Sequence, residues 1–350
     1  MSSVKLEVVQ PDTLLESIDY FSQLVSSLKI RSIFQNPKWG LVMHDSFDYD
    51  PYLLLLYDAG GKVIASLLFL MDRSTRRTQS IDGPCLDNPT TSLTDALIRA
   101  YKRVALRLGA ERVEFRLLPG LETSEKLQLF SFCGVKYLNK PLDDIWKGLD
   151  RKSVRNEIKR AIRSGVKIRE AEKPKDYLNH IKFSYESKIY GGMSLYDPEV
   201  RGFYKVIKSI ALHLKHKHKL FLANMDGNVI ATVLWLYDDH LAYYYDVGLD
   251  RKYAKYYAPD YLMWYSIERL HALGIKTINL MGLDPSHRSS WFKRKYSDKI
   301  LPNRGFIVSK PKFLIYYIRH YPYSIINFRT YLQSMLRHKL LSLTMKKKAK

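Results

Sequence analysis

Cysteine is scarce in this chain, and its scarcity excludes two classes of site. Cys85 and Cys133 are the two cysteines in 350 residues, too few for a disulfide framework or a cysteine-based zinc site. The histidines of the run His213 to Lys219 alternate with lysines, whose charge opposes a bound cation. We therefore expect no metal and a reducing, cytoplasmic location.

Long hydrophobic segments are also lacking. The first ten residues, MSSVKLEVVQ, contain no apolar core of signal-peptide length, and no later apolar run approaches the length of a membrane span. The sequence therefore predicts a chain that is neither secreted by that route nor membrane-spanning.

Acidic residues are outnumbered by basic ones. Lysine and arginine total 57 against 35 aspartates and glutamates, so the net charge is +22. A positive field of this size favours an anionic partner, which is a nucleic acid, a nucleotide or phosphorylated substrate, or an acidic membrane surface. A lysine-rich proteome with no such partner is the alternative. The 46% hydrophobic fraction is typical of a globular protein, and the length suits two domains.

What the chain does contain is an internal repeat. Apolar runs separated by a glycine turn predict one hairpin over Tyr52 to Leu70 and another over Leu220 to Tyr237. The triplet Val-Ile-Ala at 63–65 recurs at 229–231, and the Leu-Gly pair at 108–109 recurs at 273–274. Two landmarks in one order at nearly one spacing predict a duplicated domain, with chance agreement between strand sequences as the alternative.

The order of predicted elements gives the fold class. Each copy runs hairpin, third strand, helix, strand and helix, with the crossing helices at Leu93 to Leu108 and Pro259 to Leu273. A helix that crosses between two late strands indicates a mixed sheet of the α/β or α+β class. We place the first domain at residues 1–145, the second at 146–310 and a tail at 311–350.

A basic stripe is predicted on a helix from Lys152 to Ser164, at the seam between the copies. Four apolar residues fall on one face at helical spacing: Val154, Ile158, Ala161 and Ile162. Four cations fall on the opposite face: Lys152, Arg155, Lys159 and Arg163. Arg155 and Lys159 are therefore candidates for binding a phosphate-bearing substrate, and an ordinary solvated helix face is the alternative.

The strand predicted from His240 to Val247 is a second place where candidate residues gather. Strict alternation would send Tyr244 and Asp246 to the same face of the sheet. Arg251 and Lys252 follow, shortly before the next helix begins. Cations ahead of a helix amino terminus favour an anion site.

The segment from Leu273 to Tyr296 ends in a cluster of cations and aromatic rings. A buried strand is predicted from Ile275 to Met281, and a glycine-containing turn follows it. In open α/β sheets, ligands bind just outside the carboxyl ends of the strands. The candidate site residues beyond this strand are Trp291, Phe292, Lys293 and Arg294.

Five segments in this order resemble a known family. They are Ile33 to Trp39, Lys159 to Ile168, Asp226 to Tyr237, Ala258 to Ile275, and Trp291 to Tyr296. Together they resemble the Fem-type peptidoglycan bridge-forming aminoacyltransferases and their acetyltransferase-like relatives, which are built from two tandem GNAT (acyl-CoA N-acyltransferase) domains. The resemblance spans about residues 30 to 300. It implies two GNAT-like domains, each a mixed twisted sheet with flanking helices.

The resemblance also implies a reaction. An acyl or aminoacyl group would pass from an activated thioester or ester, acyl-CoA or aminoacyl-tRNA as co-substrate, to an amine acceptor such as an amino sugar or amino acid of a cell-envelope precursor. The family's Phe-Lys pair at the transfer centre matches Phe292 and Lys293. Lys293 would stabilise the oxyanion, and Asp246 would accept the proton that the amine sheds. The expected binding residues are Arg155, Lys159, Tyr244, Arg251, Lys252, Trp291 and Arg294.

Residues 311–350 form a basic, amphipathic tail. They contain nine lysines and arginines and no acidic residue. Three interpretations stay open: packing on the first domain, contact with an anionic membrane that would make the protein peripheral to its inner face, and contact with RNA such as tRNA. A non-catalytic nucleic-acid-binding or membrane-surface protein is the alternative to an enzyme.

Overall fold

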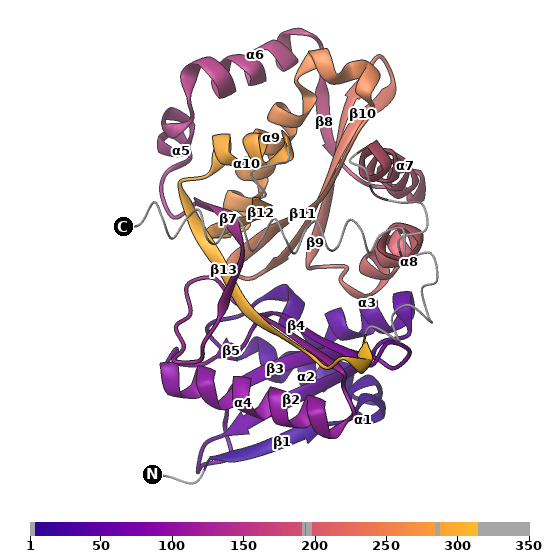
Figure 1. Cartoon of the computed structure of the whole chain (residues 1–350). Coiled ribbons are helices and arrows are strands. Elements are labelled where there is room, and N and C mark those ends of the chain that lie inside the picture. The colour runs from indigo at the N-terminus through magenta and orange to yellow at the C-terminus, as the bar shows by residue number, and fades with distance from the viewer. Residues whose placement is uncertain (1–3, 191–192, 194–197, 284–287, 314–350) are drawn as a thin grey trace. The chain divides into compact units, whose positions relative to one another are not determined.

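The computed structural model describes residues 4–190, 193, 198–283 and 288–313 of the chain. The chain divides into two compact units (Figure 1). Of the described residues, the first unit comprises 4–130, 198–201 and 302–313, and the second comprises 131–190, 193, 202–283 and 288–301. Most of the predicted tail, from residue 314 onward, lies outside the described residues. Its last described residue, Phe313, is buried under the guanidinium of Arg112 in the first unit.

The first unit is a mixed sheet with the predicted hairpin at its centre. Its strands are β1 (Lys5–Val9), β2 (Asp50–Tyr57), β3 (Val63–Asp72), β4 (Arg77–Gly83), β5 (Cys85–Leu86), β6 (Arg112–Leu117) and the end of β13 (Lys299–Ser309). The hairpin of β2 and β3 is antiparallel, as predicted, with Leu53 opposite Leu68. The later strands β4 and β6 are parallel to each other.

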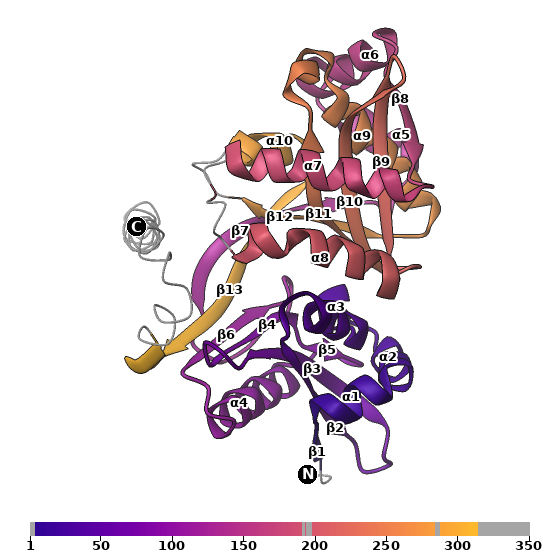
Figure 2. The ribbon, with the colours of Figure 1, turned by 90° about the vertical axis from the view of Figure 1, so that its right-hand side faces the viewer.

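Helices cover both faces of this sheet (Figure 2). They are α1 (Pro11–Glu16), α2 (Ile18–Ser26), η1 (Ile33–Gln35), α3 (Pro37–Phe47) and α4 (Thr91–Arg107). This arrangement explains why β2 is a continuous apolar run. A strand that is buried on both faces does not alternate between apolar and polar residues. The fully buried rings of Phe69, Tyr101 and Phe115 fill the core under α4.

A glutamine side chain joins β3 and β4 where their own ladder has ended. The β3–β4 pairs extend from Leu70 to Asp72, and the fully buried Gln35 takes over beyond them. Its amide nitrogen donates to the carbonyl of Ile81 at 2.8 Å, and its amide oxygen accepts from the backbone N–H of Leu68 at 2.8 Å. The early motif Ile33 to Trp39 is therefore part of the framework of the first unit.

The second unit repeats the topology of the first. Its strands are β7 (Gln128–Tyr137), β8 (Lys167–Glu170), β9 (His218–Met225), β10 (Asn228–Asp238), β11 (Leu241–Leu249) and β12 (Thr277–Leu283). They lie in the order β7, β12, β11, β10, β9, β8. The hairpin of β9 and β10 is followed by β11, a helix and the parallel strand β12. The predicted repeat and the α/β fold class are confirmed.

Two groups of helices enclose this second sheet (Figures 1 and 2). One group consists of α5 (Leu142–Gly148), η2 (Arg151–Arg155), α6 (Asn156–Arg163), η3 (Arg251–Tyr256), α9 (Ala258–Ala272) and α10 (Arg288–Tyr296). The other consists of α7 (Pro174–Tyr190) and α8 (Pro198–His213). Between the sheet and α9 lies a core around Trp235, whose indole N–H donates to the Ser266 hydroxyl at 2.9 Å.

The structure corrects the sequence prediction at the seam. The predicted helix Lys152 to Ser164 begins as a π-helical turn, η2, and continues as α6. Ile162 was assigned to the apolar face, but 49% of it is exposed, whereas Ile158 and Ala161 are fully buried. The reason is that α6 packs on another helix, α9, and a helix covers a narrower stripe than a sheet does. The strand β7, placed by the sequence in the first domain, pairs with β12.

We expect Gln35→Ala to destabilise the first unit. The substitution leaves the Leu68 N–H and the Ile81 carbonyl buried without a partner, at a cost of about 3 kcal/mol. Urea denaturation followed by fluorescence measures the loss. Gln23→Ala, at an exposed position of α2, is the matched control. An equal midpoint for the two variants would show that the Gln35 amide does not hold β3 to β4.

Candidate functional site

The parallel strands β11 and β12 of the second unit are paired over a short stretch. β11 and β12 pair at three positions, from Leu241 opposite Thr277 to Tyr243 opposite Asn279. In the first unit the equivalent ladder of β4 and β6 extends to Gly83 opposite Leu117. Past Tyr243, none of the described pairs joins β11 to β12. The ladder hydrogen bonds therefore no longer hold β11 to β12 beyond this point.

An irregularity in β12 accompanies the separation. The register of β12 against β7 shifts between Asn279 and Gly282. Met281, in this interval, has a φ of 62°, which is uncommon for a residue with a side chain. The Asn279 side chain supports the turn by accepting from the Met281 N–H at 2.8 Å. Strained backbone of this kind is frequent at functional sites.

A β-bulge in β11 overturns the prediction that Tyr244 and Asp246 share a face. Opposite β10, Trp235 pairs with Tyr244 and Leu234 with Asp246, so Tyr245 is an extra residue. Tyr244 therefore points to the α9 side, where its ring packs against Trp235 at 5.2 Å. Asp246 points to the α7 side. Alternation fails here because one inserted residue reverses the phase of the strand.

Phe292 and Lys293 lie at the open end of the β11–β12 ladder. The ring of Phe292 packs between those of Tyr244 and Tyr296, with centroids 6.4 and 5.2 Å away. The Lys293 ammonium donates to the Gly282 carbonyl at 3.0 Å and lies 5.9 Å from the centre of the Tyr244 ring. The structure thus brings together three of the predicted residues.

Burial changes the proton affinity of Lys293. Its side chain is half-buried, and the loss of water lowers its pKa to about 8, although the charge of Asp246 acts in the opposite direction. At neutral pH the group is therefore still mostly an ammonium. A partly desolvated ammonium interacts more strongly with a developing oxyanion than a fully hydrated one does.

Asp246 lies in a buried polar cluster that the sequence did not reveal. Its Oδ1 accepts from the ammonium of Lys188 on α7, and its Oδ2 is 3.5 Å from Nε2 of His180. Burial lowers the pKa of His180 to about 4, so the ring is neutral, and its Nδ1 is 2.9 Å from the Thr232 hydroxyl. Among the described residues, neither His180 Nε2 nor Asp246 Oδ2 has a hydrogen-bond partner.

The predicted binding residues occupy more varied positions. Arg155 is half-buried, and its Nε finds no partner among the described residues. The Arg251 guanidinium stacks on the ring of Tyr190 at the end of α7. Trp291 is 74% exposed. The other predicted binding residues, Lys159, Lys252 and Arg294, are also exposed.

Four residues that hold α10 in place were not among the predicted site residues. Lys295 forms an ion pair with Glu157 of α6 at 2.6 Å and lies 3.3 Å from Asp260 of α9. Tyr296 donates to the same Asp260 carboxylate at 2.9 Å. In the sequence, the run KRKY is typical of a charged surface. Its contacts become evident only once the fold places Glu157 and Asp260 beside it.

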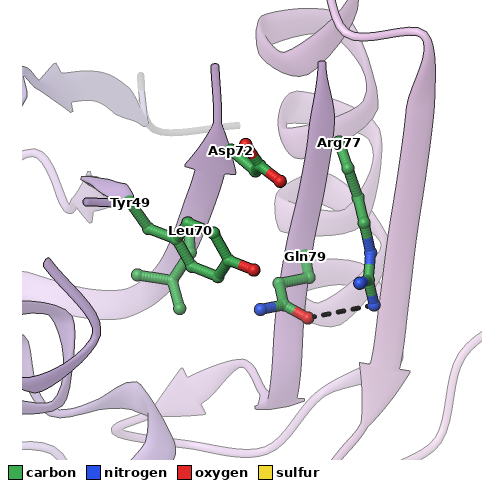
Figure 3. A pocket seen from close by; sticks show the side chains of 5 residues that line it. All are labelled: Tyr49, Leu70, Asp72, Arg77 and Gln79. Atoms are coloured by element: carbon green, nitrogen blue, oxygen red, sulfur yellow. Dashed lines mark hydrogen bonds between the residues drawn. The ribbon is translucent and has the colours of Figure 1, made fainter. Parts of the chain in front are cut away.

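A shallow hollow in the first unit is not part of this site. Its lining residues are Tyr49, Leu70, Asp72, Arg77 and Gln79 (Figure 3). Arg77 donates to Gln79 at 3.3 Å and to Glu114 at 2.7 Å, while Asp72 accepts from the turn residues Ser74 and Thr75. These contacts are structural. Elsewhere in the described part of the chain, no group of three His, Cys, Asp or Glu side chains is arranged to bind a metal.

A comparison with protein families matches residues 150–293 to the acetyltransferase (GNAT) domain. This part of the chain is similar to a GNAT domain. It includes β11, β12 and α10 up to Lys293, so the candidate site lies within the matched region. No curated protein sequence matches the chain at a significant level.

Solved structures share the fold over most of the chain. The crystal structure of FemX has a TM-score of 0.67 and 12% identity, covering 85% of this chain and 98% of that one. The C-terminal domain of a protein described as a lysylphosphatidylglycerol synthetase from Agrobacterium fabrum has a TM-score of 0.54 and 11% identity, covering 87% and 95%. L-PGS from Bacillus licheniformis has a TM-score of 0.53 and 12% identity, covering 89% and 98%.

These findings confirm the resemblance to Fem-like tandem GNAT proteins. The GNAT match supports an acyltransferase, and the solved structures show that the fold extends over both units. No described helix has the length and apolar character needed to cross a membrane.

We expect Lys293 to titrate near pH 8 in the native protein. Burial disfavours its ammonium, so the neutral and reactive amine should form about two and a half pH units lower than in an exposed lysine. Competitive acetic-anhydride labelling across pH 6 to 11, followed by peptide mass spectrometry, measures this value. An N-acetyl-lysine amide in the same tube gives the ordinary reference. Identical titration of the two would contradict the buried position of Lys293.

Proposed function

We propose that the second unit catalyses N-acyl transfer from a thioester or ester donor to an amine at the open end of the β11–β12 ladder. The observation that carries the proposal is the early separation of the two strands, with the half-buried ammonium of Lys293 beside it. An extended donor arm with amide groups would hydrogen-bond to β11 beyond Tyr243, where its ladder with β12 has ended, in the manner of an added strand. Its reactive carbonyl would then lie near Lys293.

The chemistry follows from this placement. The neutral amine attacks the carbonyl, a C–N bond forms, and negative charge gathers on the carbonyl oxygen. The Lys293 ammonium stabilises that charge. The nitrogen then loses a proton, the C–S or C–O bond breaks, and the departing thiolate or alkoxide is protonated from water. Phe292, packed on Tyr244, keeps Lys293 in place.

Asp246 is our proposed acceptor of the amine's proton. It is on β11 past the last residue paired with β12, and its charge favours the ammonium form of Lys293. Lys188 holds one carboxylate oxygen, while the other has no partner among the described side chains. That second oxygen would take the proton directly or through a water molecule.

The first unit lacks the features on which this proposal depends. Its parallel ladder continues to Gly83, and Gln35 bonds β3 to β4 where a gap would otherwise form. A side chain on Gly83 would place its Cβ 2.8 Å from the Gln35 amide carbon, so this region is tightly filled. We therefore assign the transfer to the domain proposed at 146–310.

The donor and acceptor classes are the finer part of the proposal. The loop GLDRKYAKYYA before α9 has one glycine and three cations, and it folds as η3 with Arg251 and Lys252 exposed. Together with Arg155 and Lys159, these cations would hold the phosphates of acyl-CoA or aminoacyl-tRNA. An envelope precursor with an amino sugar or amino acid is the proposed acceptor. The basic tail would then keep the protein at the inner face of an anionic membrane.

We expect Lys293→Met to lower kcat for acyl transfer about 10² to 10³-fold, because the oxyanion loses its charged partner. The protein should keep its fold, since Met fills a similar volume. Lys208→Met, at an exposed position of α8, is the matched control and should retain full activity. Unchanged transfer by the Lys293 variant would overturn the proposed role of the lysine.

The donor is identified by supplying two candidates in parallel. Purified protein is incubated with an amine acceptor and either acetyl-CoA or charged tRNA, and mass spectrometry detects the acylated amine. We expect product from one donor class and none from the other. Product from neither donor, together with RNA affinity that falls steeply as salt rises, would favour the non-catalytic nucleic-acid-binding protein instead.

A further inference from the structure

α10 is a helix with little intrinsic reason to form. It has nine residues, and its last turn consists of Lys293, Arg294, Lys295 and Tyr296. Helices this short are marginal in water, and neighbouring like charges weaken them further. Its position therefore depends on contacts with the rest of the second unit. Two of the residues that make such contacts, Lys295 and Tyr296, meet at one carboxylate.

That carboxylate belongs to Asp260, in the first turn of α9. Asp260 is 5% exposed, and its Oδ1 accepts from the Tyr296 hydroxyl at 2.9 Å and faces the Lys295 ammonium at 3.3 Å. Tyr296 is itself 1% exposed. A buried acceptor held by two successive residues of α10 restrains both the position of the helix and its rotation.

Lys295 also contacts a third helix, α6. Lys295 pairs with Glu157 of α6 at 2.6 Å and approaches the Ser153 carbonyl of η2 at 3.5 Å. One cation thus joins α10 to α9 and to the helix that carries the basic stripe. Removing one member of a buried ionic group leaves the others uncompensated, which disturbs the structure more than the loss of one surface pair.

Packing within α10 connects the Tyr296–Asp260 contact to Lys293. Tyr296 lies one helical turn after Phe292, and their rings are 5.2 Å apart. Phe292 in turn packs on Tyr244 of β11. Lys293 follows Phe292 in the chain, so the anchoring of Tyr296 at Asp260 sets where the Lys293 ammonium lies relative to the open ladder.

We infer that Asp260 is a positioning residue for the transfer, holding α10 through Lys295 and Tyr296 and thereby fixing the Lys293 ammonium at the end of the β11–β12 ladder. This inference rests on the proposed function of Lys293. Asp260 does not touch the reacting atoms. It acts on them through the helix, and a displacement of about 1 Å at a catalytic group can cost about 10²-fold in rate.

The electrostatics of the cluster add a pH dependence. The charged groups that face Asp260 are Lys295 and Glu157, and the Tyr296 hydroxyl completes the set. Burial raises the pKa of Asp260 to about 6, and the charge of Glu157 adds to the rise, because one ammonium cannot neutralise two carboxylates. Below pH 6 the protonated Asp260 therefore no longer attracts Lys295, and α10 loses one of its two anchors.

The test compares three variants of the full chain. Asp260→Asn keeps the size of the side chain and removes its charge, Tyr296→Phe removes only a hydroxyl, and Glu157→Gln removes the partner on α6. We expect kcat to fall about tenfold for Asp260→Asn and less for Tyr296→Phe. The loss of kcat below about pH 6, the acid limb of the pH profile, should disappear in Asp260→Asn. In Glu157→Gln it should remain but move to lower pH, because Glu157 no longer raises the pKa of Asp260. Circular dichroism and thermal unfolding check that each variant is folded.

A readout without substrate separates this inference from the proposed function. Acetic-anhydride labelling of Lys293 in Asp260→Asn should give a pKa above that of the wild type, since a displaced α10 exposes the lysine to water. If Lys293→Met keeps its activity, the proposed function fails, yet the labelling still reports on α10. The inference would be overturned if Asp260→Asn kept the kcat, the acid limb and the Lys293 pKa of the wild type. If Asp260→Asn does not fold, Tyr296→Phe decides in the same assays.

Discussion

The hydrogen-bonded ladder between two parallel strands is the interaction on which the candidate site depends. In the second unit this ladder ends after three residue pairs. Tyr244, Phe292 and Lys293 lie beside the place where it ends. Backbone groups left without a neighbouring strand must find other partners. Both strands are irregular near this place, with a bulge at Tyr245 in β11 and a positive φ at Met281 in β12.

The two units share a topology but differ at the end of the parallel ladder. Both contain a hairpin, a third strand, a helix and a parallel strand. In the first unit the buried Gln35 amide bonds to β3 and β4, and its surroundings are filled. In the second unit the equivalent region holds the cluster of Asp246, Lys188 and His180.

The sequence predicted those features that depend on local periodicity. Hairpins, the crossing helices α4 and α9, and the placement of Phe292 and Lys293 after a buried strand were all correct, because apolar spacing reports local burial. The shared face of Tyr244 and Asp246 was wrong, because a bulge is set by the neighbouring strand. The contacts of Asp260 with Lys295 and Tyr296 join residues 35 and 36 positions apart, and such pairing leaves no local pattern.

The last strand of the first unit has a consequence for how the protein is made. β13 pairs with β6, yet its residues are synthesised after the whole of the second unit. Until β13 has been synthesised, one edge of β6 has no neighbouring strand, and exposed strand edges promote aggregation. The alternating charges Arg112, Glu114 and Arg116 along β6 would discourage wrong partners during that interval. Arg112 and Glu114 later pair with each other in the finished sheet.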